Sequence, residues 1–491
     1  MDEHDTIQNP AFGPHSAILD RRRRTVTHAP RPSRHAIWLV LFLLLLVNLT
    51  NGISNIPLNR LLERRLCRTY YDSDHDVDEA LCKEVDSVQQ DLAWIMGAFE
   101  TLWIVGDFVM TIPLTFLSER YGRKRVLLLN LTPRLFMLFW TLGVAYFEDY
   151  LPPRAAIAGA SLSVLGGDTV FNSLIYGLAA RITEDGVTRA IYFSRMTALT
   201  SVVGFLSPAI AAAAMTIELS LPFWLGIIFL LLAIPSILLL PADDDVADDT
   251  AEARRPLISS PTLKAQASRT SLIASVVDRV HSLVSAVANF QLALLLLSML
   301  LTSLASADTK LLAQYISKRY HWTFASAGYL LSAKAVVNFV LLTFVVPLFL
   351  TTQGASQSLS DGANVRYARF CLVSSVLGAF AIGVSSVIWE LIPSLAIYAL
   401  GVPLSVFTLS LANSPNMWAR AQSGGSDGSD AQSRVLSIVM MVKTLGSLVG
   451  APLMATLWYY GIQVSFYGSP YIASSLIYLC AWCVFWNIRL G

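Results

Sequence analysis

Apolar runs of about 20 residues, separated by short polar connections, recur along almost the whole chain. An α-helix needs roughly 20 mainly apolar residues to cross the hydrocarbon core of a bilayer, and every run reaches about that length. The pattern therefore predicts an all-α membrane protein with twelve transmembrane helices. The predicted helices cover about residues 36–56, 92–116, 126–147, 155–180, 190–216, 220–241, 289–308, 325–350, 367–389, 391–413, 433–458 and 465–488.

The composition favours the same class of protein. Hydrophobic residues make up 54% of the 491 residues and charged residues 14%, whereas soluble domains carry about a quarter charged residues. A large soluble protein built of buried helices is the alternative, and this composition disfavours it. The formal net charge of +1 gives no reason to expect a nucleic-acid partner.

Basic residues near the helix ends predict the orientation, because cytoplasmic connections collect Lys and Arg. With the N-terminus inside, Arg21–Arg24 and the basic residues of every second connection fall in the cytoplasm. The loop 59–90 is the exception, since it would lie outside and holds five basic residues. We expect both termini to be cytoplasmic.

The order of the runs predicts two helical bundles joined by a polar segment. We expect a disordered cytoplasmic tail at 1–35, an N-terminal six-helix bundle at 36–241, a cytoplasmic linker at 242–288 and a C-terminal six-helix bundle at 289–491. The linker is charged and rich in Ser and Ala, which is typical of a flexible connection.

Two of the five cysteines fall in the loop 59–90, on the predicted outer side. An oxidising compartment would permit a disulfide between Cys67 and Cys82. Spacing alone leaves open whether the two thiols meet.

A tight charged turn, SERYGRKR at 118–125, separates the second and third apolar runs. It resembles the Gly-x-x-x-Asp-Arg-x-Gly-Arg-Lys/Arg signature of the major facilitator superfamily at the same connection. Thr115 replaces the first glycine of that pattern and Glu119 the aspartate. A basic turn that merely follows the positive-inside rule is the alternative. The remaining matching positions are Arg120, Gly122, Arg123 and Lys124.

The resemblance covers essentially the whole chain. RLCRTYY, LLAQYISKRYHWTFASAGYLL and LGGDTVFNSLIYGLAARITEDGVTRA look like a group of fungal permeases of that superfamily. The resemblance implies a monomeric, cofactor-free transporter of a small molecule, with the turn acting as a cytoplasmic gate. It implies the plasma membrane, with the vacuole or another internal membrane as alternatives. SPAIAA at 207–212 resembles a degenerate exporter motif, and a simple proline kink is the other interpretation.

Ionisable residues inside a membrane are costly and therefore indicate function by default. Asp107 and Arg134 both lie roughly 13 Å from the cytoplasmic helix ends, at 1.5 Å per residue, so the two side chains could pair. Glu100 lies two turns before Asp107 on the same helix face. Asp168 has no evident partner at its depth in its own half.

The remaining membrane candidates are polar or basic. Asn48 and Asn51 belong to one polar stripe of the first helix, and Lys334 and Lys443 lie in the second bundle. Acids in one half and lysines in the other suggest a polarised path for protons and substrate. Static ion pairs that hold the bundle together are the alternative. Asp308 and Lys310 lie near the outer end of a helix, where their side chains can reach the membrane surface.

Other function classes lack their residues. All seven histidines lie outside the helix cores, which disfavours a membrane enzyme or a metal site. No Gly-x-x-x-x-Gly-Lys-Ser/Thr phosphate loop appears, which disfavours a nucleotide-driven pump. We expect proton-coupled efflux of a small organic compound, such as a secondary metabolite or drug. Proton-coupled uptake of a polar or anionic nutrient is the alternative, with Lys334, Lys443 and Arg134 as ligands.

Overall fold

The computed structural model describes residues 34–488 except 74, 76, 183–185, 241–289, 342–356 and 413–427. The predicted linker and almost all of the predicted tail lie outside the described residues. Helices and short 3₁₀ segments form all the regular structure of the described chain, in agreement with the predicted all-α class.

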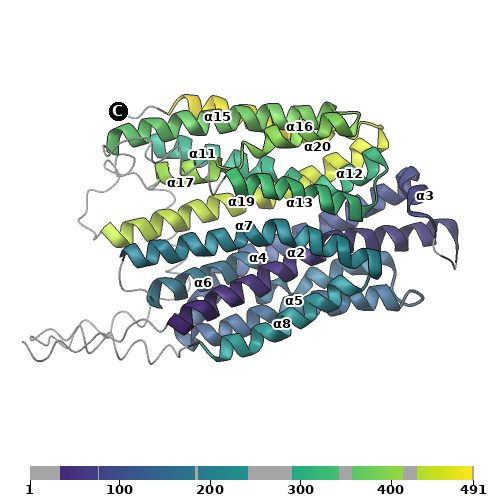
Figure 1. Ribbon diagram of the computed structural model, residues 1–491, viewed down its shortest axis with the longest axis horizontal. Coiled ribbons are helices and arrows are strands. Elements are labelled where there is room, and N and C mark those ends of the chain that lie inside the picture. Colours follow the sequence, from purple (N-terminus) through teal and green to yellow (C-terminus); the bar gives the residue numbers. More distant parts are fainter. Residues whose placement is uncertain are drawn as a thin grey trace, which may run out of the picture.

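The first half, residues 34–240, forms the lower bundle in Figure 1, coloured purple to teal. Apolar side chains of its helices meet in one large core, with a smaller separate cluster around Leu49 and Ile53. Its elements are α2 (Arg34–Tyr71), α3 (Glu79–Glu84), α4 (Asp86–Tyr121), α5 (Arg123–Tyr146), the 3₁₀ helix η1 (Pro153–Leu165), α6 (Asp168–Ile182), α7 (Gly186–Ile217) and α8 (Leu221–Leu238).

The second half, residues 290–488, forms the upper bundle, coloured green to yellow, around a second core. Its elements are α11 (Phe290–Ala305), the 3₁₀ helix η2 (Ser306–Lys310), α12 (Leu312–Tyr320), α13 (Phe324–Val340), α15 (Gln357–Val384), α16 (Ile388–Ala399), α17 (Leu404–Ala412), α19 (Gly428–Gln463) and α20 (Ser469–Trp486).

Each predicted apolar run contains helix, but two runs are broken. The run 155–180 divides into η1 and α6, and the run 391–413 divides into α16 and α17. In the described residues, ten helical segments are long and apolar enough to cross a membrane, and Phe324–Val340 is a shorter apolar helix. The exact number of spans and the orientation of the termini stay predictions.

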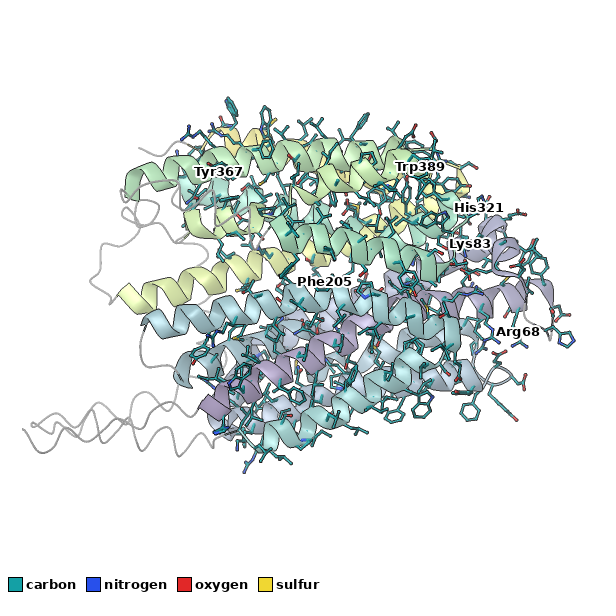
Figure 2. The ribbon with its side chains drawn as sticks, viewed as in Figure 1. Arg68, Lys83, Phe205, His321, Tyr367 and Trp389 are labelled. Carbon is teal, nitrogen blue, oxygen red and sulfur yellow. A yellow bond between two sulfur atoms is a disulfide. The ribbon has the colours of Figure 1, made fainter. Side chains whose placement is uncertain are left out.

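The two halves meet along two helix pairs, α7 with α13 and α4 with α19. Phe205 of α7 lies at this seam, with its ring centroid 5.8 Å from that of Phe339 in α13 (Figure 2). Side chains at this seam therefore come from both halves.

The two ends of the molecule differ. At the disulfide end, where α2 ends and α4 begins, Cys67 is bonded to Cys82 of α3. At the turn end, Gly122 joins α4 to α5 with φ of +90°, a conformation that glycine adopts without steric cost. Lys124 donates to the Leu238 carbonyl there, at 3.3 Å. The side chains of Glu119 and Arg120 lie outside the described part, so the cytoplasmic gate stays a prediction.

Candidate functional site

A half-exposed carboxylate forms the centre of the polar site in the first half. One oxygen of Asp168, Oδ1, accepts from Arg134 of α5 at 2.7 Å and from Asn51 of α2 at 2.8 Å. The Asp168 side chain is 52% exposed, whereas that of Arg134 is completely buried. The expectation that Asp168 lacks a partner in its own half is therefore wrong. The position of each residue along its predicted helix does not reveal the Asp168–Arg134 pair, because the apolar pattern predicts 155–180 as one continuous helix.

Arg134 is fixed from several sides. Its guanidinium donates to the main-chain oxygen of Asn130, one turn earlier, at 2.9 Å, and also to the Asn130 side chain. The Phe171 ring lies 5.4 Å from the guanidinium carbon. Since an arginine stays protonated in proteins, this arrangement places a permanent positive charge behind Asp168.

The break before α6 explains why Asp168 lies at a helix N-terminus. Gly166 adopts φ of +132°, which ends η1, and α6 starts at Asp168. Asn130 donates to the Gly167 carbonyl at 3.1 Å and so supports the break from α5. A carboxylate in the first turn of a helix also interacts favourably with the helix dipole.

Asp107 of α4 caps this helix and does not pair with Arg134. Its carboxylate accepts from the main-chain N–H groups of Gly167 at 3.1 Å, Thr169 at 2.8 Å and Val170 at 3.3 Å. These groups have no partner inside the helix, so the buried carboxylate satisfies them. The Asp107–Arg134 pair does not form. N–H groups at the start of α6 occupy both carboxylate oxygens of Asp107, and Arg134 pairs with Asp168 instead.

An ion pair connects the halves close to this site. Glu100 of α4 lies 3.4 Å from the ammonium nitrogen of Lys310 in η2. Lys310 also interacts electrostatically with Asp168. The second half therefore presents a cation to two acids of the first half, and it does so through Lys310, not through the predicted Lys334 or Lys443.

Asp308 is the most buried acid among the described residues of the second half. Asp308 has no exposed surface, although we expected its side chain to reach the membrane surface. It accepts from the Tyr398 hydroxyl at 2.8 Å, and that hydroxyl lies 3.2 Å from the hydroxyl of Tyr478. The signal in the sequence was its position two residues before Lys310, at the end of an otherwise apolar run.

The remaining candidates divide between the site and its surroundings. The ammonium of Lys334 lies 5.1 Å above the Tyr398 ring and attracts Asp308. Lys443 makes no ion pair with any described residue, and only its main-chain oxygen accepts, from Ser303 at 2.6 Å. Asn48 donates to the main chain of its own helix at 2.8 Å, so of the predicted stripe only Asn51 contacts the acid.

The small residues at 207–212 lie where α7 touches both halves. A methyl group on Gly52 of α2 would lie 2.1 Å from the Ser207 hydroxyl. A methyl group on Gly328 of α13 would lie 3.2 Å from both the Pro208 carbonyl and the Ala212 side chain. Helices without bulky side chains can approach this closely, so this stretch positions α2 and α13 beside each other.

The arrangement suits binding and charge movement. A half-exposed carboxylate, held between a permanent cation and an amide, can bind a further cationic group. In the described residues, no three His, Cys, Asp or Glu side chains lie close enough to hold a metal ion.

Comparisons with known proteins agree with the geometry. The family model described as Major Facilitator Superfamily matches residues 85–451. The MFS efflux pump atnC of Emericella nidulans is 25% identical over 491 residues, which cover 96% of this chain and 92% of that protein. The MFS-type transporter aprT of Aspergillus flavus is 28% identical over 382 residues, or 75% and 73% of the two chains.

A solved structure shares the fold. The human organic anion transporter MFSD10 (TETRAN) superposes with a TM-score of 0.58 at 16% identity, over 92% of this chain and 99% of that one. At this identity the likeness concerns the fold alone.

Proposed function

The chain belongs to the Major Facilitator Superfamily and is therefore a multi-pass membrane transporter, and we propose that it exports a small organic compound in exchange for protons. Export proceeds by alternating access, in which the two halves rock around a site between them. The substrate is a secondary metabolite or a drug-like compound. The similarity to the efflux pump atnC supports export as the direction of transport.

The observation that carries the proton coupling is the exposure of Asp168. An acid with 52% of its side chain accessible, next to a buried Arg134, can exchange a proton without breaking the bundle. Protonation removes the charge that holds Arg134 and attracts Lys310 of the other half. The proton thereby weakens an attraction between the halves, which is what coupling to alternating access requires.

The disulfide end faces outward in this proposal. The Cys67–Cys82 bond supports this side, because disulfides persist in oxidising compartments. The turn end, with Arg123 and Lys124, then lies in the cytoplasm, as the positive-inside rule expects.

Uptake of an anionic nutrient is the second candidate, and Lys443 is the observation that favours it. Lys443 lies on α19, one of the helices at the seam, and has no ion-pair partner in the described chain. A cation in that position can bind a carboxylate or phosphate group of a substrate.

Cellular accumulation tests the function and its direction. A broad panel of toxic and metabolite compounds is offered to a yeast that lacks its own exporters, with and without this protein, and each assay is repeated with a protonophore. The proposal predicts reduced accumulation of at least one compound, abolished by the protonophore. Increased accumulation of an anion would overturn export and favour uptake.

A further inference from the structure

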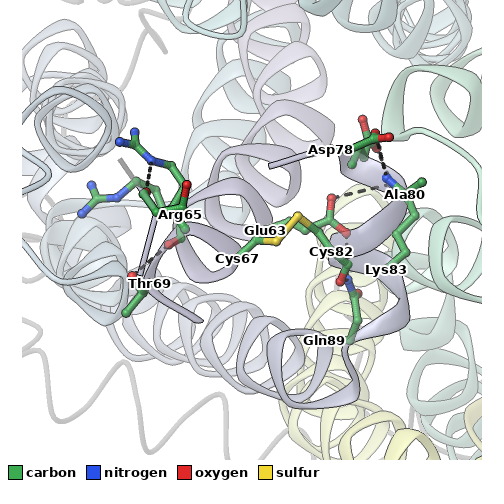
Figure 3. Close-up of a disulfide and its surroundings, with 12 residues drawn as sticks. Glu63, Arg65, Cys67, Thr69, Asp78, Ala80, Cys82, Lys83 and Gln89 are labelled. Atoms are coloured by element: carbon green, nitrogen blue, oxygen red, sulfur yellow. Dashed lines mark hydrogen bonds and ion pairs between the residues drawn. A yellow bond between two sulfur atoms is a disulfide. The ribbon is translucent and has the colours of Figure 1, made fainter. Parts of the chain in front are cut away.

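The segment between α2 and α4 is fixed firmly to the first half. The disulfide joins Cys82 of α3 to Cys67 of α2, and Gln89 of α4 donates both to Glu63 at 2.8 Å and to the Cys82 carbonyl at 3.3 Å (Figure 3). Arg60 of α2 adds an ion pair with Glu79, at 3.2 Å. The short helix α3 therefore moves with the first half.

The same short helix contacts the start of α13 in the second half. One carboxylate oxygen of Glu79 accepts from the main-chain N–H of Phe324 at 3.0 Å. The ammonium of Lys83 lies 5.3 Å from the centre of the Phe324 ring, and it also pairs with Glu79. These contacts satisfy a free N–H at the first turn of α13 from the opposite bundle.

Lys318 of α12 also joins the two halves at this end. Its side chain is 3% exposed. Its ammonium donates to the Lys83 carbonyl at 2.6 Å and pairs with Asp86 at 2.7 Å, and both partners belong to the first half. The Tyr467 ring, 5.8 Å from the ammonium, covers it from the second half.

Separation of the halves at this end would break all of these contacts together. The Lys318 ammonium would leave its first-half partners, and the Phe324 N–H would lose its acceptor. A buried charge that loses its partners is strongly unfavourable unless water replaces them. These contacts therefore stabilise the closed arrangement of the disulfide end relative to an open one.

We propose that α3, held by the Cys67–Cys82 disulfide, is the latch of the disulfide-end gate, and that Lys318 and Glu79 are its positioning residues. The disulfide-end latch comprises Glu79, Lys83, Asp86, Lys318 and Phe324. The disulfide keeps α3 in place on the first half, so that the second half can engage it at each closing. This inference rests on the family's transport activity and not on the substrate, the direction or the proton coupling.

The distance between the halves tests the latch without any substrate. Spin labels are attached at Tyr150→Cys in the first half and at Trp389→Cys in the second half. Both side chains are highly exposed, at 84% and 77%. The free cysteines Cys371, Cys480 and Cys483 are replaced by Ser, and the disulfide is kept. Pulsed electron paramagnetic resonance on the purified full chain then gives the distribution of distances.

The latch predicts a specific change in that distribution. Lys318→Met raises the ratio of the long-distance to the short-distance population by at least about tenfold. Glu79→Ala raises the same ratio, and serves as the test if Lys318→Met does not fold. Replacement of both Cys67 and Cys82 by Ser raises it as well, because α3 is then released from α2.

Arg154→Met is the matched control. It removes an ion pair with Asp91, at 3.3 Å, that lies within the first half. The control leaves the distribution unchanged if the latch exists. An unchanged distribution in both Lys318→Met and Glu79→Ala, or an equal shift in Arg154→Met, would overturn the proposal. An unchanged distribution in the paired Ser variant would overturn the role of the disulfide.

Discussion

Asp168 and Arg134 form an ion pair 2.7 Å long in which the arginine is completely buried and the aspartate is half exposed. The buried member is fixed by Asn130 and Phe171, whereas the exposed member contacts Asn51 and is attracted by Lys310. Arg134 is thus held in the bundle, whereas Asp168 remains accessible. The predictions below separate these two roles.

Arg134→Met should destabilise the protein by about 1.5–3 kcal/mol, the usual contribution of hydrogen bonds to a charged group, because the Asp168 carboxylate left behind is half exposed. The variant leaves Asp168 without its cation and removes the guanidinium hydrogen bonds to Asn130. The melting temperature of the purified protein measures the loss. Arg154→Met, at an exposed pair, should cost less than about 1 kcal/mol, and equal losses in the two variants would contradict the account.

Asp107→Asn should preserve proton-driven export, because we assign Asp107 to capping α6 and not to proton exchange. Asn keeps one of the two accepting oxygens of Asp107, whereas Ala keeps neither, and loss of a capping side chain typically costs about 1 kcal/mol. Asp107→Ala should therefore lower the melting temperature more than Asp107→Asn does. Loss of protonophore sensitivity in Asp107→Asn, at normal stability, would make Asp107 a coupling residue.

Lys310→Met should slow transport more than Glu100→Gln does. The lysine variant leaves Glu100 unpaired and removes a cation of the second half that attracts Asp168, whereas the glutamate variant removes only one attraction. Because the pair is partly exposed, the coupling from a double-mutant cycle of initial rates should stay below about 1 kcal/mol. Equal effects of the two single variants would argue against the contact with Asp168.

Lys443→Met separates the two substrate classes. If the substrate is a neutral or cationic organic compound, its apparent KM should not change. Lys124→Met, at the turn end, is the control for a general loss of positive charge. A raised KM for an anion in Lys443→Met alone would favour uptake of an anionic nutrient over the proposed export.

The apolar pattern predicted the helices well, because segment length and hydrophobicity follow directly from the thickness of a bilayer. It failed where a backbone break depends on a single turn. Gly166 and Gly167 interrupt the run 155–180, and paired glycines inside an apolar run are a recognised sign of such a break. With that break in place, the capping role of Asp107 follows from geometry.

The pattern of apolar and polar positions does not predict contacts between residues that are far apart in the sequence. Asp308 is buried because Tyr398, ninety positions away, donates to it. The contacts of Lys318 with Lys83 and Asp86 likewise join residues of opposite halves. Depth along a helix gives the level of a side chain but not the direction in which it points.

The central claim is that Asp168 exchanges the proton that drives export. The most direct measurement compares the parent and Asp168→Asn for a compound found in the accumulation panel, with and without protonophore, at matched expression. Asp91→Asn, an exposed acid of the same half, is the control. The account predicts that protonophore-sensitive export disappears in Asp168→Asn and persists in the control. Undiminished protonophore-sensitive export in Asp168→Asn would contradict it.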